Sequence, residues 1–310
     1  MTEQLSYENC KLCPRNCGVD RTGITAEDKS FPGFCKMGAG LRIARAALHF
    51  WEENCISGEE GSGAIFFSGC NLRCVFCQNR EISSERYGEE ISVERLAEIC
   101  LELQEQGANN INLVTPTHYT LSIAQALRLA KKEGLRIPVV YNCGGYESVE
   151  ALRRMEGLVD IYLPDYKYIS EALAARYSGA ADYPKRAWEA LGEMYRQTGK
   201  AEFDGRGMML RGMIVRHLVL PGHTKEAMGV LERLYTEYGN RICYSIMSQY
   251  TPLAYVAENW PELNRQITKR EYQKVIDYAI ALGIENGYIQ DGETAKESFI
   301  PPFDGTGIRK

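Results

Sequence analysis

The stretch that decides the fold is Gly69-Cys70-Asn71-Leu72-Arg73-Cys74-Val75-Phe76-Cys77-Gln78-Asn79. Its three cysteines follow a C-x3-C-x2-C spacing and come directly after a short apolar run, Ala64-Ile65-Phe66-Phe67. Because this run is rich in aromatic residues and bounded by glycines, it predicts a buried strand. The cysteines therefore occupy the loop at the carboxyl end of that strand, which is where α/β folds place their chemistry.

Three thiolates are one ligand short of a closed tetrahedral metal site. A structural zinc ion takes four protein ligands, and a ferredoxin cluster also takes four cysteines. A loop with three cysteines therefore favours a 4Fe–4S cluster in which one iron stays open for a substrate. The alternative interpretation is a zinc loop that a distant Cys or His completes.

The cysteine spacing, with Phe76 just before the last cysteine, resembles that of the radical S-adenosylmethionine (radical SAM) superfamily. The longer string GCNLRCVFCQN is similar to the version found in glycyl-radical-enzyme activases of the pyruvate formate-lyase type. The resemblance runs nearly end to end. The chain is most similar to the pyruvate formate-lyase activase-related proteins, with which it shares the cysteine-rich leader, the PTHY segment and the tail at 303–307.

This resemblance implies that Cys70, Cys74 and Cys77 bind a 4Fe–4S cluster whose open iron takes the amino and carboxylate groups of S-adenosyl-L-methionine. The reduced cluster would cleave that cofactor to methionine and a 5′-deoxyadenosyl radical, which abstracts hydrogen. Such an oxidoreductase would take its electron from a reductant such as flavodoxin or ferredoxin. Its substrate would be a glycyl radical enzyme, another protein or peptide, or a small molecule. A non-catalytic zinc-binding protein is the more distant alternative.

The resemblance also gives cofactor-binding roles to residues that follow other strands. Asp165 and Lys167 match the family's Asp-x-Lys pattern after the fourth strand, where a lysine can offer a cation to a carboxylate. Arg216 matches the arginine of a fifth strand that runs into Pro221-Gly222. The full set of predicted cofactor-binding residues is Phe76, Asn79, His118, Asn142, Asp165, Lys167 and Arg216.

Two strand ends depart from the family's pattern. Many radical SAM enzymes carry Gly-Gly-Glu after the second strand, whereas this chain has Thr115-Pro116-Thr117-His118-Tyr119. Because no acid is present there, we expect hydroxyls, carbonyls or His118 to hold the cofactor's amino group. Asn142-Cys143-Gly144-Gly145 stands where the activases have an Asp-Thr-Asn-Gly type of sequence. These changes leave the superfamily prediction intact and weigh against pyruvate formate-lyase as the substrate.

Residues 1–50 form a leader that carries four further cysteines, Cys10, Cys13, Cys17 and Cys35. The leader is rich in turn residues and has almost no periodic apolar pattern, so burial alone cannot fold it. Four thiolates could supply the missing stability by binding a metal, and both zinc and a second iron–sulfur cluster accept four cysteines. A reducing compartment argues against disulfides. The segment 37–51 predicts an amphipathic helix that links the leader to the main domain.

The composition is ordinary for a globular chain of 310 residues, with 45% hydrophobic and 25% charged residues. A net charge of -5 gives no reason to expect nucleic acid as a partner. The first ten residues lack the basic and apolar regions of a signal peptide, and no apolar run is long enough to span a bilayer. We therefore expect a cytoplasmic protein without a membrane partner.

Strands and helices alternate from Ser62 onward, and six such units predict a parallel sheet with right-handed crossovers. Eight units would close a barrel, so six predict an open, partial (β/α)6 TIM-like barrel over residues 51–310, with an irregular tail over 288–310. The predicted strands are 64–67, 111–114, 138–141, 160–163, 209–219 and 241–247. A final helix is predicted over 269–282.

Overall fold

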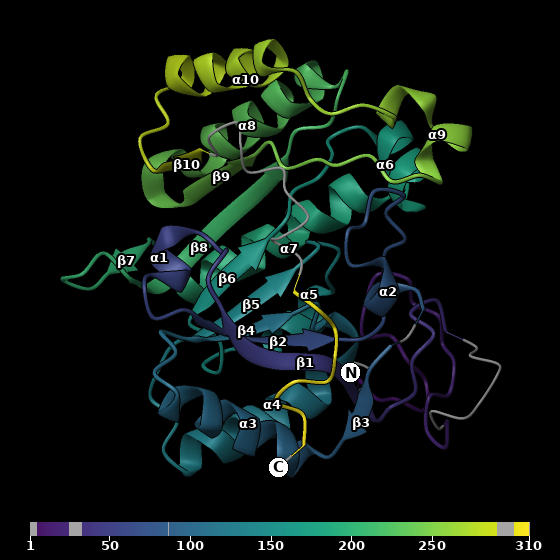
Figure 1. Cartoon of the computed structure of the whole chain (residues 1–310), viewed down its shortest axis with the longest axis vertical. Coiled ribbons are helices and arrows are strands. Elements are labelled where there is room, and N and C mark those ends of the chain that lie inside the picture. Colours follow the sequence, from purple (N-terminus) through teal and green to yellow (C-terminus); the bar gives the residue numbers. More distant parts are fainter. Residues whose placement is uncertain (1–4, 25–32, 86, 290–300, 310) are drawn as a thin grey trace.

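The protein is described here by a computed structural model that covers residues 5–24, 33–85, 87–289 and 301–309. Its centre is a curved sheet with the strand order β10-β9-β8-β6-β5-β4-β2-β1-β3, and β7 pairs with β8 (Figure 1). The strands are β1 (Leu41–His49), β2 (Ser62–Phe67), β3 (Glu89–Ile91), β4 (Ile111–Val114), β5 (Val139–Cys143), β6 (Ile161–Pro164), β7 (Glu202–Phe203), β8 (Met209–Leu218), β9 (Cys243–Met247) and β10 (Gly287–Ile289).

All six predicted strands are present, and each runs parallel to its neighbour from β2 through β4, β5, β6 and β8 to β9. The predicted α/β fold with a parallel, partial-barrel sheet is therefore confirmed. β10 adds a seventh parallel strand beyond β9, inside the segment predicted to be irregular. Among the described residues, β3 and β10 are the two outer strands of this path and do not pair with each other, so the barrel stays open.

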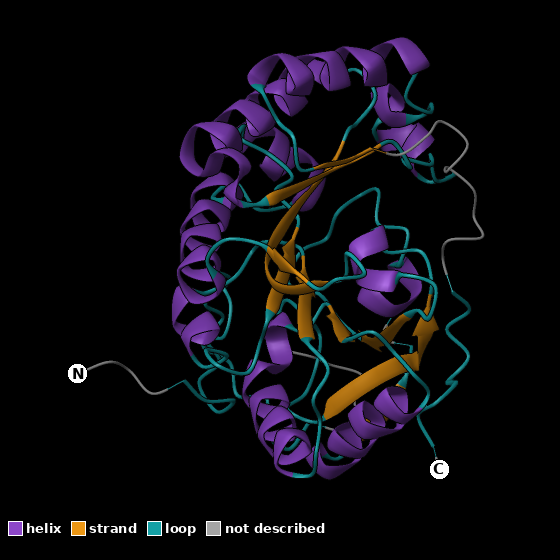
Figure 2. Ribbon diagram, turned by 90° about the vertical axis from the view of Figure 1, so that its left-hand side faces the viewer, coloured by secondary structure: helices purple, strands orange, loops and turns teal. Residues whose placement is uncertain are grey.

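The longer helices lie on the outer side of the curved sheet (Figure 2). Their ends follow local chemistry: the Ser92 side chain accepts a hydrogen bond from the Arg95 amide, and Thr268 and Glu271 form a capping box. The helices are α3 (Val93–Glu105), α4 (Thr120–Lys132), α5 (Val149–Arg153), α6 (Glu171–Ser178), α7 (Tyr183–Thr198), α8 (Thr224–Tyr238) and α10 (Lys269–Leu282). Shorter turns are α1 (Asn54–Ser57), α2 (Arg80–Ser83), α9 (Val256–Asn259), η1 (Thr117–Tyr119), η2 (Gly239–Arg241) and η3 (Pro261–Leu263).

The prediction of a helix over 37–51 is wrong, because this segment contains β1. β1 pairs antiparallel with β2 on one side and with β3 on the other. β1 is buried on both faces, because Ile43 and Ala46 pack in the main core while Ala44 packs with Phe66 and Phe303 in a separate cluster. The alternation typical of a strand is therefore lost from the sequence. The sequence of this segment suits a helix and a strand about equally well. The edge of β2 needs a hydrogen-bonding partner, and this tertiary requirement selects the strand. The sheet thus begins at Leu41, inside the predicted leader.

Both chain ends pack against the sheet. In the tail, the Ala46 amide donates to the Thr306 carbonyl at 2.9 Å, and the described residues 301–309 pass in front of β1 (Figure 1). The prediction of an irregular tail is confirmed for these residues, while 290–300 lie outside the described ones. The leader lies over the carboxyl ends of the strands, where Arg15 Nε donates to the Asn71 carbonyl at 2.8 Å. No helix in the described part of the chain is long and apolar enough to cross a membrane.

Candidate active site

The cysteine loop leaves β2 at the mouth of the partial barrel. Gly69 has φ +87°, and a Cβ there would come within 2.3 Å of Met37 Cγ, so only glycine fits this close approach. Asn71 Nδ2 donates to the Tyr146 carbonyl at 2.5 Å, and the Val75 amide donates to the Tyr177 carbonyl at 2.8 Å. The loop is therefore tied to the segments after β5 and at the end of α6.

The three thiols of this loop share one environment. The Leu72 amide donates to Cys70 Sγ at 3.3 Å, and Cys74 Sγ lies 3.0 Å from Ser178 Oγ. Burial raises the pKa of Cys70, and the neighbouring Cys74 and Cys77 raise it further. Burial also raises the pKa of Cys74, whereas the Lys167 ammonium acts in the opposite direction. Cys70 and Cys74 therefore stay protonated near neutral pH unless a cation, such as a metal centre, holds them as thiolates.

Behind the loop, polar side chains from β5, β6 and β8 meet in the barrel interior. Arg216 donates from Nε to Asp165 at 3.0 Å and from Nη2 to Asn142 Oδ1 at 2.5 Å, and Lys167 Nζ lies 2.5 Å from Asp165. Burial alone would raise the pKa of Asp165, but Lys167 and Arg216 hold it below its usual value. The predicted residues Asn142, Asp165, Lys167 and Arg216 are thus brought together.

Two glutamates that the sequence analysis missed complete this network. Glu52 accepts from Asn112 at 3.0 Å, from Asn142 at 3.2 Å and from Arg216 at 3.2 Å. Burial raises the pKa of Glu53, and Arg216 counteracts this effect. Glu53 Oε2 and Asn112 Oδ1 are buried without a hydrogen-bond partner in the described structure. The only sequence signal is a pair of acids between two strands, which by itself predicts a solvated turn.

The end of β4 is strained and contacts a third acid that the sequence analysis missed, Glu147. Thr115 has φ +62°, a left-handed conformation that β-branched residues rarely adopt. Thr117 Oγ1 donates to Glu147 at 2.6 Å, and Tyr141 Oη donates to the same carboxyl group at 3.1 Å. Burial raises the pKa of Glu147 to about 7, although these hydrogen bonds oppose the shift. An acid from the segment after β5 therefore reaches the position where the sequence after β4 has none.

The predicted residue His118 is buried beneath the cysteine loop. Its Nε2 lies 2.7 Å from the Ser68 carbonyl, and burial with the nearby Arg21 lowers its pKa to about 3. It is therefore neutral, and Nε2 carries the proton because only a donor can face a carbonyl. Nδ1 is left as a buried acceptor without a partner among the described residues. His118 thus supports the loop and offers one free lone pair.

Phe76 and Asn79 hold the far end of the loop. The Phe76 ring is buried and meets Tyr250 edge-on, with 6.3 Å between ring centroids. Asn79 immediately precedes α2 and makes no capping hydrogen bond through its side chain. Gln78 Nε2 donates to the Gln249 carbonyl at 3.1 Å. The segment after β9 therefore contacts the loop that follows β2.

In the leader, cysteine side chains gather around a buried cation. Arg21 is only 1% exposed, and it donates to the carbonyls of Met37, Gly38 and His118. Its Nη1 also lies 3.5 Å from Cys10 Sγ. Burial raises the pKa of Cys35. The charge of Arg21 opposes this rise, whereas the nearby thiols of Cys10 and Cys17 add to it. Burial raises the pKa of Cys13 to about 12, and the nearby Cys35 and Cys10 add to it.

Within the described ranges, no group of three or more His, Cys, Asp or Glu side chains is arranged so that it could hold a metal ion, either in the leader or in the cysteine loop. The fit to a metal centre therefore rests on the type and proximity of the donors. In the loop, three soft thiol donors share one buried environment with a backbone amide directed at sulfur. This donor set suits an iron–sulfur cluster better than a hard cation.

Comparison with known proteins identifies the family. The sequence model of the radical SAM superfamily matches residues 64–234, which is more than half of the chain. The chain belongs to the radical SAM superfamily. This radical SAM protein is 28% identical over 282 residues to the uncharacterized protein MJ0674 of Methanocaldococcus jannaschii, covering 88% of this chain and 75% of that relative.

Two solved structures share parts of the fold. SuiB of Streptococcus suis, bound to its precursor peptide SuiA, superimposes with a TM-score of 0.50 at 12% identity, covering 70% of this chain. This chain spans about half the length of SuiB, 46%. The FeFe-hydrogenase maturase HydG of Carboxydothermus hydrogenoformans has a TM-score of 0.47 at 11% identity, covering 77% of this chain and 55% of HydG. Membership implies that this enzyme uses a 4Fe–4S cluster and S-adenosylmethionine.

Proposed function

We propose that this radical SAM enzyme abstracts a hydrogen atom from a polypeptide, either a glycine of a partner enzyme or a residue of a peptide. The observation that carries the proposal is the joining of the thiols to the interior network: burial raises the pKa of Cys74, the Lys167 ammonium opposes that rise, and Lys167 also forms an ion pair with Asp165. When bound, the reduced cluster and S-adenosylmethionine supply a 5′-deoxyadenosyl radical. The network lies where that radical would need to be oriented and kept from water.

We assign the following roles. Cys70, Cys74 and Cys77 would hold the cluster. Lys167 and Arg216 would face the carboxylate of the cofactor, because both are buried cations. Their charges are held in place by Asp165.

For the cofactor's amino group, we assign Glu147 as the acceptor, which Thr117 fixes at the end of β4. His118 Nδ1 is the second acceptor on that side. Phe76 and Asn79 would shape the rest of the site.

The polypeptide substrate is supported by the open edge of the sheet between β3 and β10 and by the likeness in fold to a protein whose structure was solved with a precursor peptide. An activase of a glycyl radical enzyme is the narrower version, which the string GCNLRCVFCQN favours. A small-molecule substrate is the alternative. A neighbouring gene for a glycyl radical enzyme would favour the activase.

The experiment is anaerobic purification with iron, sulfide and zinc analysis of the wild type and of Cys70→Ala/Cys74→Ala/Cys77→Ala. Dithionite and S-adenosylmethionine are then added, and 5′-deoxyadenosine is measured. We expect the variant to lose about four irons and all product. Zinc without iron, and no product from the wild type, would contradict the proposal and leave a structural zinc protein.

The substrate is tested with polypeptides that carry deuterated glycine. Deuterium in the 5′-deoxyadenosine would support abstraction from a polypeptide. If deuterium reaches 5′-deoxyadenosine only from labelled small molecules and not from polypeptides, the proposal of a polypeptide substrate is wrong.

We also propose that Cys10, Cys13, Cys17 and Cys35 bind a second metal, either zinc or another iron–sulfur cluster. Support comes from Arg21, whose described hydrogen bonds go to carbonyls and a thiol and to no carboxylate. A buried cation needs a compensating negative charge, and a four-thiolate metal centre carries one.

A further inference from the structure

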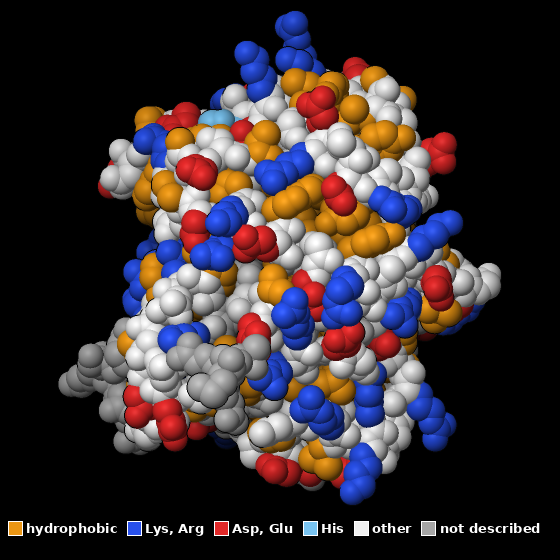
Figure 3. Space-filling model, turned by 180° about the vertical axis from the view of Figure 1, so that it is seen from behind, with side chains coloured by type: hydrophobic (Ala, Val, Ile, Leu, Met, Phe, Trp, Pro, Cys, Tyr) orange, Lys and Arg blue, Asp and Glu red, His pale blue; other side chains and the backbone are white. Residues whose placement is uncertain are grey.

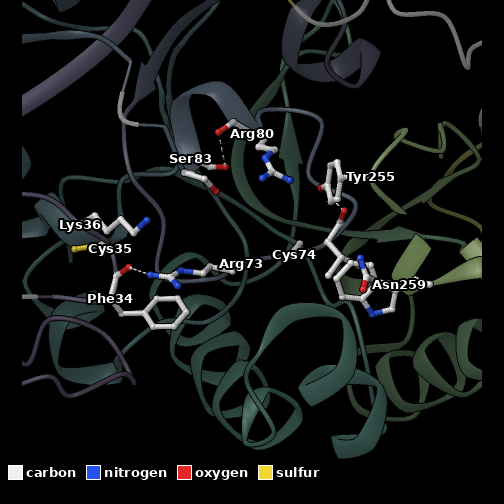
Figure 4. A pocket seen from close by; sticks show the side chains of 12 residues that line it. Phe34, Cys35, Lys36, Arg73, Cys74, Arg80, Ser83, Tyr255 and Asn259 are labelled. Carbon is white, nitrogen blue, oxygen red and sulfur yellow. Dashed lines mark hydrogen bonds between the residues drawn. The ribbon is translucent and has the colours of Figure 1, made fainter. Parts of the chain in front are cut away.

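A cavity of about 390 Å³ lies between the leader, the cysteine loop and α9 (Figure 4). One cysteine of each group lines it, Cys35 from the leader and Cys74 from the loop. On the other side of the loop, Leu72 lies beside Gly144 together with Lys167 of the barrel interior. The loop therefore separates an inner side, where the cofactor would bind, from an outer side that opens into this cavity.

Three cations from three different segments line the cavity, and among the residues that the structure describes no carboxylate does. Lys36 comes from the leader, Arg73 from the cysteine loop and Arg80 from α2, and all three are exposed. Arg80 has one weak partner outside the lining, Glu85, at 3.7 Å, and both side chains are about half exposed or more. In a chain of net charge -5, this is a local region of opposite sign. On the back face of the molecule, by contrast, basic and acidic side chains are interspersed (Figure 3).

Aromatic rings hold these cations in place. The Arg73 guanidinium lies 4.3 Å from the centre of the Phe34 ring, and that of Arg80 lies 4.2 Å from the centre of the Tyr255 ring. Arg73 also donates to the Phe34 carbonyl at 3.3 Å. Trp260 adds a further ring to the lining. A set of fixed cations with apolar surface between them is suited to contact with a protein surface.

The charges favour a broad acidic surface over a small anion. A buried anion site needs a desolvated cation or a converging set of donors, whereas these three cations are exposed and stand apart around the cavity. Electrostatic complementarity of this kind steers an encounter and fixes its orientation. It also overcomes the average repulsion between a chain of charge -5 and an acidic partner.

We propose that this cavity and its rim are the docking site of an acidic electron-carrier protein of the flavodoxin type. The inference rests on the proposed function, because the carrier's task would be to reduce the loop's cluster. One electron leaves the reduced carrier and enters the cluster, and no bond is formed or broken. The face is the outer side of the cysteine loop, so the carrier reaches the cluster without entering the barrel.

The test compares two double variants with the same change in charge. Lys36→Glu/Arg80→Glu reverses two cations of the rim, and Arg128→Glu/Lys185→Glu reverses two exposed cations on α4 and α7. Each anaerobically reconstituted holoenzyme is titrated with a purified acidic flavodoxin at two salt concentrations, and the Kd is measured. Formation of 5′-deoxyadenosine is then measured with reduced flavodoxin and, separately, with dithionite. Iron content and melting temperature report on folding.

We expect the rim variant to raise the Kd for flavodoxin about tenfold or more and to lose flavodoxin-driven product, while the control variant stays within about twofold of wild type. Wild-type binding should weaken with salt, because exposed charges are screened. Dithionite-driven product should stay the same in all three proteins. If the rim variant proves unstable, Lys36→Gln/Arg80→Gln replaces it, with a smaller expected change.

Equal Kd values for the rim and control variants would overturn the docking site. So would binding of inorganic phosphate in the cavity with no binding of flavodoxin. Absence of product from the wild type with dithionite would instead contradict the proposed function, and the Kd comparison would still decide the docking site.

Discussion

Arg216 is the residue on which the barrel interior depends. Its three nitrogens contact Asp165, Glu52 and Asn142, and its charge also acts on Glu53. Asp165 keeps Lys167 as a second partner, whereas Glu52 has no other cation in the described structure at ion-pair distance. A single guanidinium thus compensates acids that come from two distant parts of the chain.

Replacing Arg216 with Ala should destabilise the protein by about 3–5 kcal/mol, because it leaves buried carboxylates without a counter-charge. Arg216→Lys should lose less stability, because the positive charge remains and only the multiple hydrogen bonds of the guanidinium group are lost. Denaturant unfolding under anaerobic conditions measures both. The control is Arg186→Ala, which removes two exposed ion pairs and should change stability by about 1 kcal/mol or less. Equal effects of Arg216→Ala and Arg186→Ala would show that the interior network does not stabilise the fold.

Glu147 predicts a pH dependence of stability. Its pKa is about 7 in the folded protein, above its ordinary value of 4.5, so the folded state holds the proton more tightly than the unfolded state. The resulting stability is complete below pH 4.5 and is lost as the pH rises through 7.

Glu147→Gln should remove this loss of stability at higher pH, because the amide side chain stays neutral at every pH. The stability of the variant relative to wild type should therefore increase between pH 4.5 and 8, by up to roughly 3 kcal/mol. Denaturation curves across this range measure the difference. A difference that does not vary with pH would show that Glu147 does not titrate in this way.

At the scale of elements, the cysteine loop is positioned by other segments more than by its own strand. Asn71 stands between two residues of the motif, is buried, and donates to the Tyr146 carbonyl after β5. Its own carbonyl accepts from Arg15 of the leader. The loop's conformation therefore depends on a contact to the β5 unit, which β4 separates from β2 in the sheet, and on one to the leader.

Asn71→Ala should leave the fold intact and loosen the loop, because one buried hydrogen bond is lost and the Tyr146 carbonyl is left unpaired. We expect the iron content after anaerobic reconstitution to fall about twofold or more. Asn109→Ala is the matched control, since it removes side-chain hydrogen bonds to Ser57 and Glu60 outside the site. A similar iron content in both variants would contradict the role of Asn71.

At the scale of the whole molecule, the leader covers the mouth of the barrel. Tyr7 hydrogen-bonds with Ser122 of α4, Arg15 reaches Asn71 and Gly179, and Arg21 reaches the His118 carbonyl. These contacts connect three βα units to one short segment that has little apolar core of its own. A metal bound by the leader would therefore stabilise the mouth as well as the leader.

Replacing Cys10, Cys13, Cys17 and Cys35 with Ser should remove one metal centre and leave the iron of the cysteine loop in place. Metal analysis by mass spectrometry then identifies the centre as zinc or iron. We also expect the melting temperature to fall by several degrees, because about 1 kcal/mol corresponds to roughly 2–4 °C in a chain of this size or smaller. An unchanged metal content would refute the second site. Cys100→Ser/Cys243→Ser, which changes two buried cysteines elsewhere, is the control for lost packing.

Much of the fold and part of the site could be predicted from local patterns. The strand before Gly69 and the alternation of six βα units depend on neighbours in sequence, and the sheet confirms both. The cysteine spacing is equally local, and the cluster that it predicts stays a prediction. The segment 37–51 could not be predicted, because alanine-rich alternation suits a helix or a strand until the edge of β2 supplies a partner. Parallel strands place their carboxyl ends at one edge of the sheet. The order of the strands along the chain was therefore enough to predict that Asn142, Asp165 and Arg216 meet.

The sequence by itself determined the family, the parallel partial barrel and the three cysteines of the loop, because spacing along the chain fixes which side chains share a loop or a strand end. Only the tertiary structure decided that Glu52 and Glu53 enter the barrel interior, that Glu147 reaches the residues after β4, and that Lys36, Arg73 and Arg80 surround one cavity. These residues come from segments that are far apart or irregular, where no periodicity relates position in the sequence to position in space. The physical reason is that charge pairing and burial act through distance in space, and only folding sets that distance.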